Sequence, residues 1–202
     1  AGEKAFCAGN DLKFTAKGGR SSLPPSGFSG LTQRFDLEKP IVAAVNGFAM
    51  GGGFETALSC DVIIASQNAT FALPEVKVGF LAAASGVQRL SRYIGRLAAQ
   101  EMMFTGRSVK ADEALKMGIV NNVVAHDQLI ECALAKAQEI ASVSPSAIKA
   151  TKRVLNDMAL RENLPQSLDF SRKVVADLAN TEDFKEGLNA FVEKRKPNWV
   201  NR

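Results

Sequence analysis

Short apolar runs alternate with glycine-rich turns in the first half of the chain, and helical patterns fill the second half from about Gly86. Unbroken apolar runs that stop at a glycine or at a polar turn are typical of buried strands. They predict strands at Ala5–Ala8, Ile41–Val45 and Val62–Ala65, and a further strand-like run covers Ile119–Val124. The pattern therefore predicts an α/β fold followed by an α-rich region.

Helices are predicted where apolar residues recur every three or four positions and where caps or glycines mark the ends. Residues 17–30 hold several glycines, prolines and serines, a composition that predicts a mobile surface loop. No internal repeat or clear linker is found in the sequence. The predicted helices cover Phe54–Leu58, Val87–Ile94, Leu97–Phe104, Ala111–Met117, Leu129–Ile140, a segment beginning at Ser144-Pro145, Pro165–Leu178 and Thr181–Arg195.

The composition is that of an ordinary globular chain: 202 residues, of which 46% are hydrophobic and 23% charged. It excludes disordered and fibrous proteins, and no apolar stretch is long enough to predict a membrane span. The net charge of +4 is spread along the chain, with its densest cluster at Lys194–Lys196, so nucleic acid is not an expected partner.

The cysteines and the single histidine give no sign of a disulfide framework or a metal site. Cys7, Cys60 and Cys132 are odd in number, widely spaced and embedded in apolar runs, which favours reduced thiols buried in a core. Reduced thiols indicate an intracellular, reducing compartment, cytoplasmic by default, with mitochondrial as the alternative. His126 has no neighbouring ligands at metal-binding spacing, so no metal is predicted.

Three consecutive glycines, Gly51–Gly53, stand directly before a predicted helix. They allow backbone amides at a helix N-terminus to approach a ligand oxygen, or they allow the helix to pack tightly on a strand. The run matches neither the phosphate-binding loop motif nor the spaced glycines of dinucleotide-binding folds.

Glu55 and Glu75 are the candidate catalytic pair. Two carboxyl groups can divide acid and base roles where burial separates their pKa values. For glutamates 20 positions apart the alternative is two solvated surface residues, and only the flanking sequence favours chemistry.

That flanking sequence resembles the crotonase (enoyl-CoA hydratase/isomerase) superfamily. Six motif segments occur in the superfamily's order, and the likeness extends to the C-terminal residues. The segments are Ala5–Leu12, Lys39–Gly47, Met50–Glu55, Cys60-Asp61, Phe71–Glu75 and Gln88–Leu90.

The resemblance implies a crotonase fold of ββα units in two roughly perpendicular sheets with a C-terminal helical extension. It implies a core over residues 1–140 and, over 141–202, a helical region used in assembly and in covering the active site. Homotrimers or hexamers are the implied assembly. The family carries further strands before the first matching segment, so the chain is expected to be N-terminally truncated.

The resemblance also implies an enzyme, a lyase, that reversibly hydrates a trans-2-enoyl-CoA to a 3-hydroxyacyl-CoA. The backbone amides of Asn10 and Gly52 would form the oxyanion hole, and Glu55 and Glu75 would be the catalytic residues. Coenzyme A would be part of the acyl-CoA substrate, with no separate cofactor. Double-bond isomerisation, dehydration of a specialised hydroxyacyl-CoA and an inactive relative of the fold are the alternatives.

Further positions are implied contacts of the coenzyme: the Ala8 backbone near adenine, Lys13 near phosphate, and Phe191 with Lys194 from the last helix. The loop 17–30 would border the acyl group.

One segment departs from the family pattern. Many hydratases have Pro-Gly on the loop after the second glutamate, where this chain reads Leu-Ala-Ala-Ala-Ser-Gly from Leu81 to Gly86. A Cβ at Ala83, a substrate-binding position, disfavours a positive φ that glycine would tolerate. The departure is consistent with a differently placed water, another acyl group, a dehydratase direction or no change of chemistry.

Overall fold

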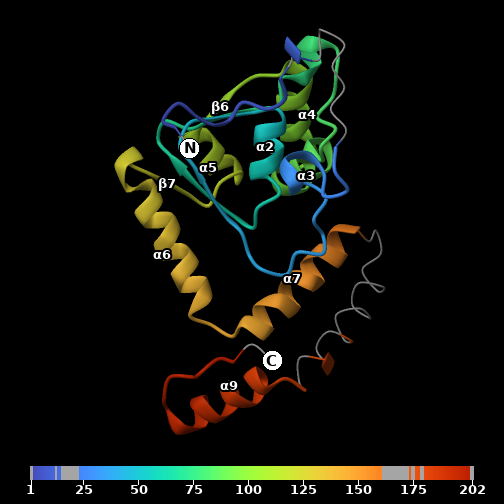
Figure 1. Cartoon of the computed structure of the whole chain (residues 1–202). Helices are drawn as coiled ribbons and strands as arrows, with labels where there is room; N and C mark the ends of the chain where they lie inside the picture. Colours follow the sequence, from blue (N-terminus) through green and yellow to red (C-terminus); the bar gives the residue numbers. More distant parts are fainter. Residues whose placement is uncertain are drawn as a thin grey trace. The chain divides into compact units, whose positions relative to one another are not determined.

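The computed structural model describes residues 2–11, 13, 14, 23–160, 173, 176, 177 and 180–200. The chain divides into two compact units. Residues Ala1–Arg34 and Ile41–Ala135 form the first, and Phe35–Pro40 and Lys136–Arg202 form the second (Figure 1). The predicted division at residue 140 stays a prediction.

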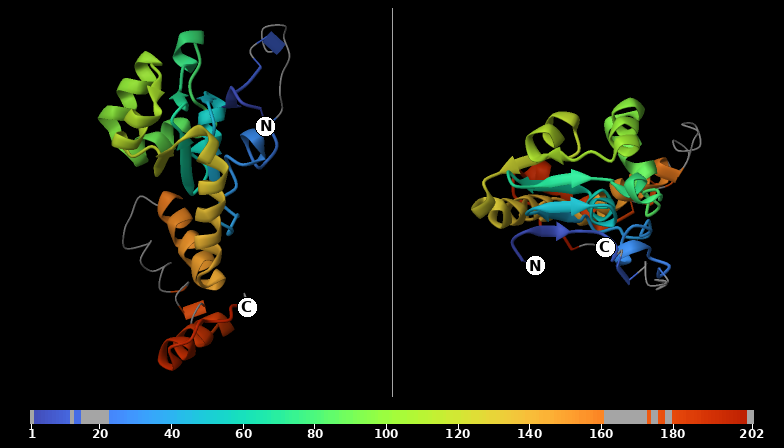
Figure 2. Two further views of the ribbon diagram at one scale, coloured as in Figure 1. Left: turned by 90° about the vertical axis from the view of Figure 1, so that its left-hand side faces the viewer. Right: turned by 90° about the horizontal axis from the view of Figure 1, so that it is seen from above.

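The first unit contains two sheets among its described residues. One has the strand order β1 (Ala5–Cys7), β3 (Phe48–Met50), β5 (Thr70–Ala72) and β6 (Val109–Lys110). Its first three strands are parallel, and β6 runs antiparallel to β5. The other sheet places β4 (Val62–Ser66) between β2 (Val42–Val45) and β7 (Asn122–Val124), all parallel. Figure 2 shows strands of this unit running side by side.

The strand β4 is buried along nearly its whole length, as expected for a central parallel strand. It pairs with β2 in a regular register from Val42 opposite Val62 to Val45 opposite Ala65. β-branched side chains suit such a strand because they pack closely on a pleated surface.

The helices of the first unit are short, and several of them end at glycines. Gly95, Gly106 and Gly118 have positive φ, which residues with a Cβ rarely adopt, and each follows a helix directly. The helices of this unit are η1 (Phe28–Gly30), α2 (Gly52–Ala57), η2 (Glu75–Val78), α3 (Gly86–Ile94), α4 (Arg96–Thr105), α5 (Ala111–Met117) and η3 (His126–Gln128). The next helix, α6 (Leu129–Ala141), begins in the first unit and ends in the second.

The core of the first unit gathers around α2, which lies beside α3 while α3 packs on α4 (Figure 1). Phe54 and Phe71 are fully buried, with ring centroids 5.3 Å apart. Leu58, Leu90 and Met102 are buried with them, so α2 is anchored by apolar side chains of its own and of its neighbours.

The second unit contains α7 (Pro145–Leu160) and α9 (Glu182–Glu193), which contact each other. Asp183 is fully buried and accepts hydrogen bonds from the Ser146 amide, the Ser146 hydroxyl and the Val200 amide over 3.2, 2.8 and 2.8 Å. Across the described parts of both units, no helix has the length and hydrophobicity needed to cross a membrane.

Most predicted elements are found close to their predicted bounds. The prediction omitted β3, β5 and β6, which are only two or three residues long. The helix predicted at Pro165–Leu178 lies almost wholly outside the described residues. The same is true of residues 17–22 of the predicted loop.

Two predictions need correction. The end of the glycine-rich loop is packed within the first unit, because it forms η1 and brings the ring of Phe28 against α2. Of the three thiols, all free, only Cys60 is buried, whereas Cys7 and Cys132 are half-buried.

Candidate active site

The N-terminus of α2 packs directly on the end of β1. A Cβ on Gly53 would lie 1.9 Å from the carbonyl oxygen of Cys7, far inside van der Waals contact. Gly9 has φ +88°, and a Cβ there would lie 2.7 Å from the Met50 oxygen and 3.2 Å from the Gly52 nitrogen. Tight packing of the helix on the strand therefore accounts for the glycines at both positions.

This packing brings together the two segments predicted to form the oxyanion hole. Asn10 follows Gly9 at the end of β1, and Gly52 is the first residue of α2. The first amides of a helix lack intrahelical acceptors, so they point toward the space before the helix. The ring of Phe28 lies 2.7 Å from where a Cβ on Gly52 would be. The oxyanion role of the two amides stays a prediction.

Glu55 is the buried carboxyl group of α2, with only 3% of its surface exposed. Its Oε1 accepts a hydrogen bond of 2.7 Å from the amide of Gly86, at the start of α3. The pKa of Glu55 is raised to about 7, mainly by burial and also by the nearby charge of Glu75, against the lowering effect of the Gly86 and Ala84 amides. Glu55 can thus gain and lose a proton near neutral pH.

Glu75 is the first residue of η2 and is half-buried. Its Oε2 is buried and has no hydrogen-bond partner among the described residues, while its Oε1 lies 2.9 Å from where a Cβ on Gly51 would be. Burial raises the pKa of Glu75. The charge of Glu75 thus acts on the buried Glu55, and the alternative of two solvated surface residues is wrong.

The loop that departs from the family pattern has its positive φ at a residue other than Ala83. Ala83 is exposed and its φ is not positive, so its Cβ causes no backbone strain. The positive φ on this loop belongs to Ser85, at +87°, immediately before Gly86. The role of Ala83 in binding substrate stays a prediction.

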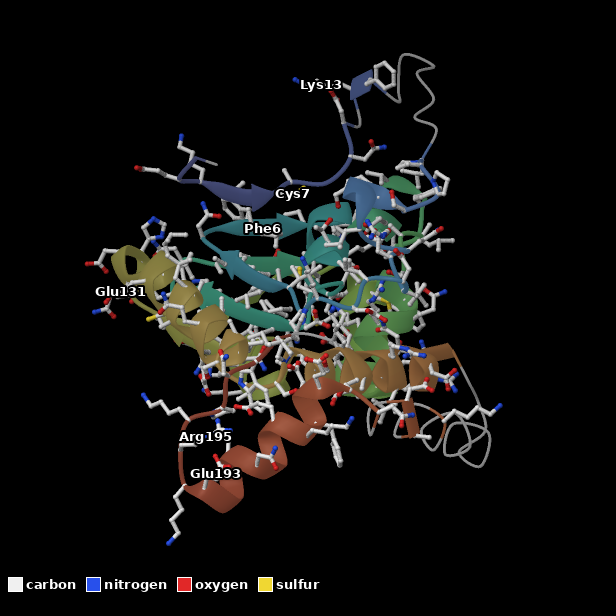
Figure 3. All side chains as sticks on the ribbon, turned by 60° about the horizontal axis from the view of Figure 1, so that its bottom comes forward. Phe6, Cys7, Lys13, Glu131, Glu193 and Arg195 are labelled. Carbon is white, nitrogen blue, oxygen red and sulfur yellow. The ribbon has the colours of Figure 1, made fainter. Side chains whose placement is uncertain are left out.

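The predicted coenzyme contacts are only partly described. Ala8 and Lys13 are exposed beyond β1, where Asp11 accepts a hydrogen bond from the Lys13 amide, and Figure 3 shows Lys13 at the edge of the first unit. Lys194 is exposed just after α9. Phe191 belongs to α9, but its side chain lies outside the described residues. These contacts stay predictions.

Sequence reasoning missed the residues around Glu55. Gly86, Arg89 and Thr32 received no role, although Arg89 lies in one of the motif segments. The motif around Arg89 was the one available signal, because Thr32 lies just beyond the predicted loop 17–30 and in none of the motif segments.

The whole chain, residues 1–202, matches the protein family described as enoyl-CoA hydratase/isomerase. The chain belongs to this family. A carnitinyl-CoA dehydratase of Salmonella typhi is 44% identical over 206 residues, which cover 100% of this chain and 79% of that protein.

Solved structures of enoyl-CoA hydratases agree with the family assignment. The enzyme from Bacillus anthracis matches with a TM-score of 0.89 and 37% identity, and that from Mycobacterium tuberculosis with 0.92 and 34%. Both matches cover 100% of this chain and 79% of the other. The predicted superfamily, the crotonase fold and an enzyme of the lyase class are confirmed.

Proposed function

We propose that this chain catalyses the reversible addition of water across the 2,3 double bond of a trans-2-enoyl-CoA, giving a 3-hydroxyacyl-CoA. One observation carries the proposal: the carboxyl group of Glu55 is buried, with a pKa near 7, and the charge of Glu75 acts on it, while a buried oxygen of Glu75 has no partner among the described residues. Such a pair can exchange protons with a substrate at neutral pH.

The two glutamates act on opposite ends of the double bond. Ionised Glu55 takes a proton from the water whose oxygen bonds to C3, and protonated Glu75 gives a proton to C2. In dehydration the same groups act in reverse. The proton that remains on Glu55 must return to Glu75, directly or through solvent, before the next hydration.

The thioester oxygen gains negative charge while C3 is attacked. The amides of Asn10 and Gly52 would stabilise it, and one such donor typically lowers the barrier by about 3 kcal/mol. Coenzyme A is part of the substrate in this reaction, so no separate cofactor takes part. Ala8, Lys13, Phe191 and Lys194 would hold the coenzyme, with Ala83 near the acyl group and a trimer or hexamer as the assembly.

A second candidate is the dehydration of a specialised 3-hydroxyacyl-CoA. The 44% identity to a carnitinyl-CoA dehydratase favours it. The roles of Glu55 and Glu75 are the same in this reaction, and only the acyl group and the favoured direction differ. Isomerisation is less favoured, because moving a double bond needs only one base and this site holds two carboxyl groups.

The test follows the loss of crotonyl-CoA absorbance for the parent chain, Glu55→Gln and Glu75→Gln. Each glutamine variant should lose about 10²- to 10⁴-fold in kcat, as expected for a general acid or base. Glu131→Gln is the control, because Glu131 is exposed on α6 (Figure 3).

Retention of the parent rate by both variants would overturn the proposal. Activity of Glu55→Gln in moving the double bond of a 3-enoyl-CoA would indicate an isomerase. Activity of the parent on carnitinyl-CoA but not on crotonyl-CoA would indicate the specialised dehydratase.

A further inference from the structure

Arg89 connects two segments that border the proposed site. From its place on α3, its Nη1 donates a hydrogen bond of 2.9 Å to the carbonyl oxygen of Thr32. The same nitrogen donates to the hydroxyl of Ser85, at the start of the helix. Ser85 precedes Gly86, whose amide holds the carboxyl group of Glu55. One guanidinium group thus reaches both Thr32 and the turn that contacts Glu55.

The Thr32 segment covers the start of α2. Thr32 is 1% exposed, and its Oγ1 accepts a hydrogen bond of 2.9 Å from the amide of Phe28. The ring of Phe28 lies against Gly52, one of the two predicted oxyanion amides. A displacement of Thr32 would therefore move the residue that shields Gly52.

The turn at Ser85 has a conformation that needs support. Its φ of +87° lies in the left-handed region, which is unfavourable for a residue with a Cβ. The Ser85 side chain does not cap α3 and instead accepts the hydrogen bond from Arg89. This contact stabilises the turn in the one orientation that aims the Gly86 amide at Glu55.

We propose that Arg89 is a positioning residue, which holds the Ser85–Gly86 turn against Glu55 and the Thr32 segment over Gly52. The inference rests on the proposed function for its catalytic consequence, because it makes Arg89 act through Glu55 rather than on the substrate.

Two charged groups act on Glu55: Glu75 from η2 and Arg89 from α3. Glu75 raises the pKa of Glu55, whereas the charge of Arg89 and the hydrogen bond from Gly86 lower it. Loss of Arg89 removes its charge and loosens the Gly86 contact, so the pKa of Glu55 should rise. Because Glu55 must be ionised to accept the proton of water, the fall of kcat on the acid side of its pH profile (the acid limb) should move to higher pH.

The experiment compares Arg89→Met with Arg92→Met, a matched change at an exposed position of the same helix. With crotonyl-CoA, Arg89→Met should lower kcat by about 10- to 100-fold, the scale expected when catalytic groups are misplaced by about 1 Å. KM should change little, and the acid limb should shift upward. Arg92→Met should keep the parent profile, and Arg89→Lys should restore part of the lost rate.

A second readout needs no substrate. Unfolding in urea is measured over a range of pH for the parent and for Arg89→Met, each with and without Glu55→Gln. The difference that Glu55→Gln makes in each protein reports the protonation midpoint of Glu55 alone. That midpoint should rise in Arg89→Met. It tests the positioning role even where crotonyl-CoA is not hydrated, so failure of the inference and failure of the proposed function are distinguishable.

Ser85→Gly provides a variant that should fold in any case, because glycine accepts φ +87° without strain. It removes the hydroxyl that Arg89 contacts, so it should lower kcat while the midpoint of urea unfolding stays equal or rises. An unchanged Glu55 midpoint in Arg89→Met, or a parental kcat in Ser85→Gly, would overturn the inference.

Discussion

Replacing Glu55 by glutamine should make the protein more stable at high pH while it removes activity. The unfolded chain ionises Glu55 near its ordinary pKa of 4.5, whereas the folded chain does so near 7. The folded state therefore binds the proton more tightly, and the stability due to this proton is lost as pH rises through about 7. A difference of this size corresponds to about 3 kcal/mol, at roughly 1.4 kcal/mol per pKa unit.

Glutamine keeps the shape of the protonated acid, and its amide oxygen can still accept the hydrogen bond from Gly86. It never ionises, so Glu55→Gln should match the parent near pH 4.5 and exceed its free energy of unfolding by about 3 kcal/mol at pH 8.5. Most of the difference should develop between pH 5 and 8.

Urea unfolding followed by circular dichroism at several pH values measures this difference. Glu131→Gln, at an exposed position, should show no such trend. A Glu55→Gln variant whose stability relative to the parent is the same at pH 5 and pH 8.5 would refute the buried, proton-binding state of Glu55. The proposed catalytic role would then lose its physical basis.

Two further predictions concern packing. Gly53→Ala places a methyl group 1.9 Å from the Cys7 oxygen and should destabilise the chain by about 3 kcal/mol or more. Its control, Gly79→Ala, lies in open space at φ +72° and should cost only about 1 kcal/mol. Equal midpoints of urea unfolding for the two variants would contradict the close contact at Gly53. Asp183→Ala removes the acceptor of three hydrogen bonds and leaves buried donors around Ser146 without a partner, so it should lower the free energy of unfolding by about 3 kcal/mol. A decrease of less than about 1 kcal/mol in the same assay would show that water replaces the carboxylate.

The sequence predicted best the elements whose ends carry clear chemical signals. The helix Ala111–Met117 was predicted with its observed bounds, because acids in its first turn, a lysine in its last and Gly118 beyond it all agree. Strands β3 and β5 were missed, since three residues are too few to show a period of two. Their short apolar segments become strands only by pairing with each other and with β1.

The site was predictable in its residue types but not in its geometry. The motifs named Glu55 and Glu75, yet nothing in a separation of 20 positions shows that η2 returns to the start of α2. The network of Arg89 could not be predicted from periodicity either. Its partner Thr32 lies 57 positions earlier, just beyond the predicted loop 17–30, in a segment for which no role was predicted.

The short helix α2 explains how an acid that is costly to ionise can be kept in this fold. Glu55 faces the site, while Phe54 on the same helix and Leu58 at its end are fully buried in the core. Burying a side chain of this kind contributes about 1.5–3 kcal/mol, so the two together match or exceed the cost of about 3 kcal/mol for ionising Glu55. The apolar residues on either side therefore fix the helix in place whether or not the carboxyl group carries a charge. This arrangement lets Glu55 change its protonation state during a reaction without loosening the backbone that presents it.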